Sequence, residues 1–262
     1  MTLPDNAEMG LVAREGALLA GGARAILLQI AHPAVGRGVA EHSDFAERPL
    51  DRLRATLTYV YCVTFGTPEE IEAVAAQVTA AHRSVTGAGY RATDPELQLW
   101  VAATLYDTAI LLYEELFGPL DAAAADKVYE QYAVLGTALQ LPARSWPADR
   151  AAFRAYWNHM VDTLEVSDEA RRVAHDLLSA EHAPLLLKAA MPLNRFLTAA
   201  WLPERIRAQY EISWDSRQQR RYELLRTVGA PLYRLLPVPL REAPKTWYLR
   251  EMRKRLSAAP PA

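Results

Sequence analysis

Residues 67–85 read TPEEIEAVAAQVTAAHRSV, and this stretch decides the fold class. Thr67 is suited to cap a helix, Pro68 fits the first helical position, and Glu70 completes a capping box. Behind this start, apolar residues recur at three- and four-residue spacing, as one face of an α-helix requires. The members of that face are Ile71, Val74, Ala75, Val78, His82 and Val85. The stretch therefore predicts a capped amphipathic helix that Gly87 and Gly89 close.

The same period continues along the chain, and no long run alternates apolar and polar residues as a strand would. Helices are expected at about 8–19, 23–31, 50–65, 68–85, 95–117, 121–139, 147–164, 167–178, 185–202, 203–210, 216–228 and 245–256. Pro192 is expected to kink helix 185–202 or split it in two, and residues 36–49 are expected to form a loop. We predict one compact all-α domain of about ten helices over residues 1–262, with a disordered tail at 257–262.

Composition narrows the function classes. The 262 residues are 51 % hydrophobic, which is enough for a sizeable core. The formal net charge of −2 gives no basic footprint, so no nucleic-acid partner is expected. Cys62 is the single cysteine, which excludes an intrachain disulfide and a cysteine-based zinc site. Residues 1–10 lack a signal-peptide pattern and no apolar run reaches 18 residues, so a cytoplasmic location is expected.

The sequence lacks the common enzyme signatures. It contains no phosphate-binding glycine loop, no nucleophile elbow, no His-Glu-x-x-His pair and no Glu-x-x-His pair. The candidates reduce to the histidines His32, His42, His82, His159, His175 and His182. His82 lies on the apolar face of its helix, where it is either a core histidine bonded to a backbone carbonyl or a metal or haem ligand. His32 precedes Pro33 at a helix end, where capping of backbone groups is its simplest role.

Arg52 and Thr56 are four residues apart and so share one face of the predicted helix 50–65. Their simplest interpretation is a surface arginine and a threonine that bonds back to its own helix. Arg54 and Thr58 have the same spacing. The pair therefore indicates a functional site only in combination with other features.

The order of several short segments is more specific than any one of them. The segments are 21–35 GGARAILLQIAHPAV, 39–45 VAEHSDF, 49–56 PLDRLRAT, 65–67 FGT, 81–87 AHRSVTG, 94–97 DPEL, 99–101 LWV and 111–120 LLYEELFGPL. In this order they resemble the MpaB / rubber-oxygenase catalytic domain family (DUF2236). The resemblance covers roughly residues 10–215.

This resemblance implies an all-helical domain with a partly globin-like core that binds haem b. In the rubber-cleaving members a helix histidine is the proximal iron ligand, and His82 matches it. Arg52 and Thr56 match an arginine and a threonine beside the haem. Arg52 is then expected to pair with a haem propionate or to polarise bound oxygen, and Thr56 to donate to that oxygen or to pack. His32 and His42 match histidines of small bacterial members, and His32 is included among the expected haem contacts.

Two positions depart from the family pattern. The distal lysine of some rubber oxygenases falls at Ala55, and the histidine of a common Trp-Val-His-Ala-Thr segment falls at Ala102. The chain is also shorter than the rubber-cleaving enzymes, so polyisoprene is not the expected substrate.

The resemblance implies a haem b-dependent oxygenase that acts on a small apolar or isoprenoid-like substrate with O₂ or peroxide, with Arg52 and Thr56 as catalytic residues. One alternative is a haem-binding sensor or carrier without turnover, in which His32 fills the second axial position. The other is a haem-free helical protein that binds a lipid or a partner, with peripheral membrane contact through its basic C-terminal helices. The basic residues concerned are Arg217, Arg220, Arg221, Arg226, Arg250, Arg253, Lys254 and Arg255.

Overall fold

The computed structural model describes residues 6–42, 49–179 and 185–258, with the backbone alone for 49–52 and 185–187. The α-helices are α1 (Ala7–Ala13), α2 (Gly22–Ala31), α3 (Pro33–His42), α4 (Pro49–Phe65), α5 (Pro68–Ser84), α6 (Pro95–Phe117), α7 (Ala122–Tyr132), α8 (Val134–Thr137), α9 (Arg150–Thr163), α10 (Asp168–Ser179), α11 (Leu185–Trp201), α12 (Glu204–Gln209), α13 (Ser216–Leu235), α14 (Val238–Arg241) and α15 (Ala243–Ala258). Two 3₁₀ segments are η1 (Gly16–Gly21) and η2 (Ala143–Ser145). The predicted all-α fold is confirmed.

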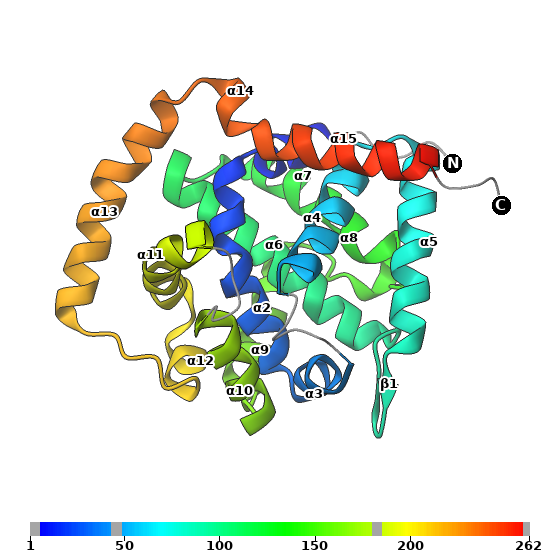
Figure 1. Ribbon diagram of the computed structural model, residues 1–262, viewed down its shortest axis with the longest axis horizontal. Helices are drawn as coiled ribbons and strands as arrows, with labels where there is room; N and C mark the ends of the chain where they lie inside the picture. The colour runs from blue at the N-terminus through cyan, green and yellow to red at the C-terminus, as the bar shows by residue number, and fades with distance from the viewer. Residues whose placement is uncertain (1–5, 43–48, 180–184, 259–262) are drawn as a thin grey trace.

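Helix α6 runs through the middle of the molecule (Figure 1) and contributes to two clusters of buried side chains. In one cluster, Trp100 stacks on Trp157 with ring centroids 5.4 Å apart, and its Nε1–H donates to the carbonyl of Leu28 at 2.9 Å. In the other, the Tyr106 ring meets the Phe153 ring edge-on at 4.8 Å. Aromatic pairs in these geometries add to the stabilisation from area burial alone. The apolar residues of α6 therefore face neighbouring helices on more than one side.

The start of α5 is confirmed in detail. Thr67 Oγ1 accepts from the Glu70 N–H at 3.3 Å, and Glu70 Oε2 accepts from the Thr67 N–H at 3.0 Å. The Arg253 guanidinium on α15 also donates to Glu70, with Nε 2.7 Å from Oε1. The cap and the ion pair together fix the position of α5 at its N-terminal end.

The predicted loop at 36–49 is wrong for residues 36–42, because α3 is a helix from Pro33 to His42. The extended backbone of His32 before Pro33 ends α2, and the chain turns by 108° into α3. A Cβ added at Gly36 would lie 2.6 Å from the carbonyl oxygen of Ile30. Gly36 is therefore needed for close approach of α3 to α2, and its presence was misinterpreted as a loop signal. Residues 43–48 lie outside the described residues.

Other boundaries also differ from prediction. Helix α13 continues through Pro231 to Leu235, beyond the expected end at 228, and α11 is one helix through Pro192, so the expected alternative of two short helices is wrong. The expected helix 121–139 is divided into α7 and α8. Helix α15 extends to Ala258, into the segment predicted as a disordered tail, and residues 259–262 lie outside the described residues.

The one pair of strands in the described chain is the short hairpin of β1 (Thr86–Gly87) and β2 (Tyr90–Arg91), which sequence reasoning missed. Gly89 adopts φ +82° in its turn, a conformation that glycine accepts without strain. The glycines at 87 and 89 were interpreted only as the end of a helix. They instead allow a hairpin that extends from the end of α5 (Figure 1).

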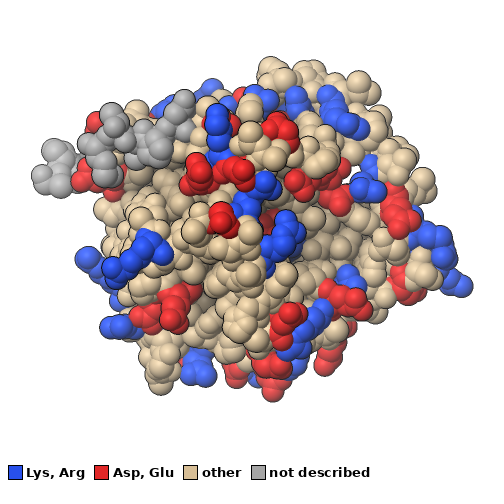
Figure 2. Space-filling model, turned by 180° about the vertical axis from the view of Figure 1, so that it is seen from behind, with Lys and Arg blue, Asp and Glu red and all other residues tan. Residues whose placement is uncertain are grey.

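Within the described residues, no single helix is both long and apolar enough to cross a membrane, and the bent pair Gly16–Ala31 and Pro33–His42 meets that test only jointly. The surface viewed from behind carries Lys and Arg interspersed with Asp and Glu (Figure 2).

Candidate functional site

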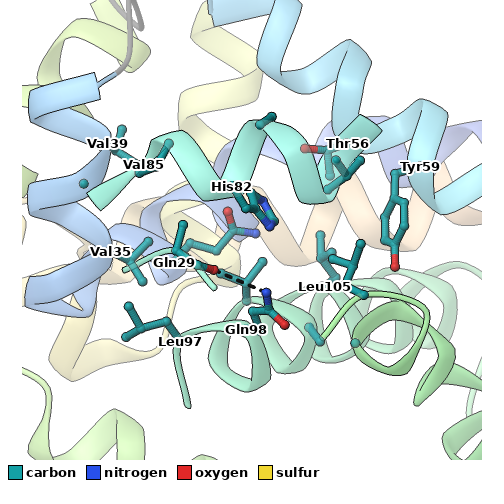
Figure 3. Close-up of a pocket in the computed structure, with 18 of the residues that line it drawn as sticks. Gln29, Val35, Val39, Thr56, Tyr59, His82, Val85, Leu97, Gln98 and Leu105 are labelled. Carbon is teal, nitrogen blue, oxygen red and sulfur yellow. Dashed lines mark hydrogen bonds between the residues drawn. The ribbon is translucent and has the colours of Figure 1, made fainter. Parts of the chain in front are cut away.

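A cavity of about 340 Å³ lies between α3, α4, α5, α6 and the β1–β2 hairpin, with α2 and α8 closing it (Figure 3). Most of its lining is apolar. The apolar lining residues include Val35, Val39, Val78, Val85, Leu97, Val101, Leu105, Leu135 and Leu139. The volume falls in the range of sites that take small organic ligands, which is roughly 300–1,000 Å³. The walls favour a ligand that is mainly apolar.

His82 is half-buried on α5, and its imidazole points into this cavity beside Gln29 (Figure 3). The capped start of α5 sets the helix so that Ile71 and Val74 pack in the core while Val78, one turn before His82, lines the cavity. His82 lies on the same side of the helix as these residues, as its spacing predicts. It lines a cavity and is not part of the closed core.

Two carboxamides interrupt the apolar walls. Gln29 on α2 and Gln98 on α6 are each 5 % exposed and line the cavity. Gln98 Nε2 donates to the carbonyl of Ala92 at 3.3 Å and to Gln140 Oε1 at 2.7 Å, which fixes the orientation of the amide. Gln98 Oε1 is buried and accepts no hydrogen bond from a described residue. An unsatisfied buried acceptor is unfavourable, so Gln98 offers a site for a donor on a ligand.

One side of the cavity is held together by contacts between α3 and the hairpin. His42 Nε2 lies 2.9 Å from the Thr86 carbonyl, and the rings of His42 and Tyr90 meet edge-on at 6.2 Å. The Tyr90 hydroxyl donates to Glu41 Oε2 at 2.6 Å. Burial, reinforced by this carboxylate, raises the pKa of Tyr90 to about 12. Tyr90 is therefore a neutral donor at physiological pH, and it anchors the hairpin to α3.

The structure brings together some of the expected site residues and not others. Thr56 is half-buried on α4 and lines the cavity with His82. Arg52 also lies on α4, but its side chain is outside the described residues. His42 lines the cavity, whereas His32 is not part of its lining.

His32 instead serves the junction between α2 and α3. Its Nδ1 accepts a hydrogen bond from the Ala34 N–H at 3.2 Å. Burial lowers the pKa of His32, and the nearby Glu96 carboxylate opposes that shift. The neutral imidazole accepts this bond, so His32 satisfies a backbone N–H at the start of α3.

Both departures from the family pattern line the cavity. Ala55 lies beside Thr56 on α4, and Ala102 lies on α6. The longer side chains expected at these two positions from the resemblance would occupy space that this chain leaves open. Sequence reasoning missed Gln29 and Gln98. Each is a lone carboxamide within an apolar helical run, a signal that could have identified them.

The donor set around His82 is sparse. Among the described residues, no group of three or more His, Cys, Asp and Glu side chains is placed to hold a metal ion. The polar side chains in the described lining are those of His82, His42, Thr56, Gln29, Gln98, Tyr59 and Tyr90. Of the two imidazoles, His42 is held at Nε2 by the Thr86 carbonyl, and both tyrosine hydroxyls are engaged, by the Leu135 carbonyl and by Glu41.

Comparisons with known proteins agree with the order of segments in the sequence. A family model described as "ER-bound oxygenase mpaB/B'/Rubber oxygenase, catalytic domain" matches residues 10–232. Uncharacterised proteins from Mycobacterium bovis and Mycobacterium tuberculosis are each 38 % identical over 222 residues, covering 81 % of this chain and 87 % of each relative. No solved structure matches the chain. The family match ends at residue 232, within α13, whereas the resemblance was expected to cover roughly residues 10–215.

Proposed function

The chain belongs to the family of the ER-bound oxygenase mpaB and rubber-oxygenase catalytic domain, and on this premise we propose that it is a haem b-dependent oxygenase. Its substrate is a small, mainly apolar or isoprenoid-like organic molecule, oxidised with O₂ or peroxide. The observation that carries the proposal is the imidazole of His82 directed into an apolar cavity of about 340 Å³.

The residues present fit a haem. A porphyrin brings four nitrogen ligands of its own, so the protein needs to supply one axial donor and apolar walls. His82 would supply the donor, and the valines and leucines of α3, α5 and α6 would supply the walls. Bound haem b would supply the activation of O₂ or peroxide.

The other residues of the cavity bind and orient. Thr56, on the α4 side, would donate a hydrogen bond toward the interior. The role of Arg52, pairing with a carboxylate such as a propionate, is carried over from the family resemblance alone. Gln98 accepts a hydrogen bond from a hydroxyl group of the substrate, because its Oε1 has no described partner and its Nε2 is held by Ala92 and Gln140. The apolar walls exclude water from the reacting group. The substrate class is therefore an apolar body with one neutral polar group.

The sensor alternative needs a second axial ligand from the protein. His32, its expected ligand, is not part of the cavity lining and accepts a hydrogen bond from the Ala34 N–H. His42 lines the cavity but lies 2.9 Å from the Thr86 carbonyl. These placements favour the oxygenase proposal over the sensor alternative, because neither histidine is free and directed into the cavity as a second ligand would need to be.

The proposal is tested by titrating haem into three purified proteins, which are wild type, His82→Ala and His175→Ala. The Soret absorbance reports binding. His175 is 78 % exposed on α10 and is the matched control. We expect wild type and His175→Ala to bind one haem, and His82→Ala to lose about a hundredfold in affinity. Added imidazole is expected to restore the Soret band of the folded His82→Ala protein. Full haem occupancy in His82→Ala would contradict the ligand assignment.

A further inference from the structure

Helix α13 turns a stripe of apolar side chains toward solvent. Leu224, Val228, Leu232 and Leu235 recur at spacings of four, four and three, so they lie along one side of the helix. Leu224 is 66 %, Leu232 59 % and Leu235 79 % exposed. Large apolar side chains gathered along one exposed face are typical of interaction sites.

The opposite side of α13 is polar and holds the helix in this orientation. Tyr222 accepts a hydrogen bond from Trp201 Nε1 at 2.9 Å, and the Tyr233 hydroxyl donates to Glu15 Oε2 at 2.9 Å. Ala230, on the same side, is buried. The helix is thus amphipathic in the reverse sense, with polar groups toward the protein and leucines toward solvent.

The exposed apolar surface continues past the end of α13. Leu236, Val238 and Leu240 are also exposed, and they carry it across α14. In Figure 1, α13 and α14 form the outer edge of the molecule on the side away from α5. Exposed apolar residues therefore continue along the chain from α13 into α14, and α13 lies far from the β1–β2 hairpin (Figure 1).

Positive charge accompanies this surface. Arg217 and Arg221 are exposed and fall on the same side of α13 as Leu224, at spacings of four and three. Residues 216–241 contain six arginines and one acidic residue, Glu223, in a chain whose net charge is −2. Arg226 and Arg241 pair with Glu115 and Glu15, so the other four arginines carry the positive charge of this surface. The stripe is thus basic in its first turns and apolar in its later turns. An interfacial helix that binds anionic lipid combines the same two features.

We propose that α13 and α14 form a docking surface for the face of an anionic membrane, on which the leucines enter the lipid boundary and Arg217 and Arg221 contact headgroups. A second copy of the chain fits this surface less well. A two-fold interface must be self-complementary, and the stripe from Arg217 to Leu235 holds no acidic residue to meet its arginines. The surface is independent of the cavity, so this proposal and the oxygenase proposal can fail separately.

Vesicle flotation of the full-length protein tests the proposal. The probes are vesicles of phosphatidylcholine alone and of phosphatidylcholine with phosphatidylglycerol, at low salt and at about 0.15 M salt. The variants are Leu232→Ser/Leu235→Ser and Arg217→Gln/Arg221→Gln. The matched controls are Leu11→Ser, at an exposed leucine of α1, and Arg144→Gln/Arg172→Gln, at exposed arginines of η2 and α10.

We expect wild type to float with anionic vesicles and to bind pure phosphatidylcholine more weakly. Binding should fall about tenfold for each leucine replaced and about fivefold for each arginine at low salt, with the controls unchanged. Analytical ultracentrifugation should show a monomer in each case. The proposal is overturned by absence of vesicle binding, by equal loss in the controls, or by a wild-type dimer that Leu232→Ser/Leu235→Ser dissociates.

Discussion

Helices α5 and α13 lie at opposite sides of the molecule (Figure 1). Both are amphipathic, but α5 turns its apolar face toward the protein and α13 turns its polar face toward it. Helix α5 buries Ile71 and Val74 and exposes its charged residues. Helix α13 places Tyr222 and Tyr233 against the protein and exposes Leu232. The pattern in the sequence predicts a helix in both cases, but it does not state which face meets the core.

The residues that pack beneath each helix decide which of its faces turns toward the protein. Under α13, the Glu15 carboxylate is 2 % exposed and binds Tyr233 and Arg241. A buried carboxylate requires hydrogen-bonding partners, so the polar side of α13 must turn inward. Under α5 lie apolar residues of the core and the cavity, which favour Ile71 and Val78. Neighbours distant in sequence therefore decide the orientation of both helices.

The largest expected effect comes from removing a polar contact beneath the C-terminal segment. Arg241→Ala removes the ion pair of Glu15 at 2.9 Å and leaves the longer one to Arg14 at 3.6 Å, and the loss should be about 3 kcal/mol in the free energy of unfolding. Urea denaturation measures it, with Arg144→Ala as the near-neutral control. Adding Glu15→Gln to Arg241→Ala should recover part of the loss. A loss below about 1 kcal/mol would show that the buried Glu15 carboxylate does not need Arg241 as its partner.

The next effect compares apolar residues on the two helices. Ile71→Ala on α5 should lower the free energy of unfolding by about 2 kcal/mol, because it removes buried methylene groups. Leu232→Ala on α13 should change it by less than about 0.5 kcal/mol, because that side chain is already in water. Equal losses in urea denaturation would mean that Leu232 is covered in the folded protein in solution.

Removing the N-terminal cap of either helix should cause a smaller loss of stability, equal for α5 and α13. Both helices begin with a capping box, with Thr67 and Glu70 at α5, and Asp215 and Gln218 at α13. Thr67→Ala and Asp215→Ala should each lower stability by about 1 kcal/mol, since each leaves a backbone N–H without its acceptor. Replacement by Ser at either position should retain most of the stability. A large difference between the two alanine variants would mean that one helix end is supported by contacts beyond the cap.

The smallest expected effect is a pH dependence from His32. Because burial lowers the pKa of this histidine in the folded state, the unfolded chain binds the proton more tightly. The resulting stability is complete above the ordinary value of 6.5 and is lost as pH falls below it toward the folded-state pKa. The His32→Gln variant should therefore lose less stability between neutral and mildly acidic pH than wild type. Identical pH profiles in thermal unfolding would contradict this assignment.

Local signals were enough to predict much of the fold. The capping box at Thr67 and the Asp94-Pro95 start, with Gly118 at the end, place α5 and α6 within a residue of the observed bounds. Gly36 misled the prediction of α3, because a glycine required for helix contact looks the same in sequence as a glycine in a loop. The hairpin at Gly89 was missed because a glycine in a tight turn looks the same in sequence as a glycine that ends a helix.

The site was predictable only in part. The spacing on α5 placed His82 on an inward face, but the haem assignment came from the resemblance, and the structure adds the cavity into which the ring points. Gln29 and Gln98 come from helices far apart in the chain. Their meeting near His82 depends on the packing of α2 against α6. That packing is a tertiary feature that no local pattern contains.

The central proposal is that the cavity would hold haem through His82. The most direct measurement is the absorption spectrum of the protein expressed with a haem precursor, first oxidised, then reduced with and without carbon monoxide. The account predicts a Soret band that shifts when carbon monoxide is added to the reduced protein. Absence of a Soret band, or a reduced spectrum that carbon monoxide leaves unchanged, would contradict it.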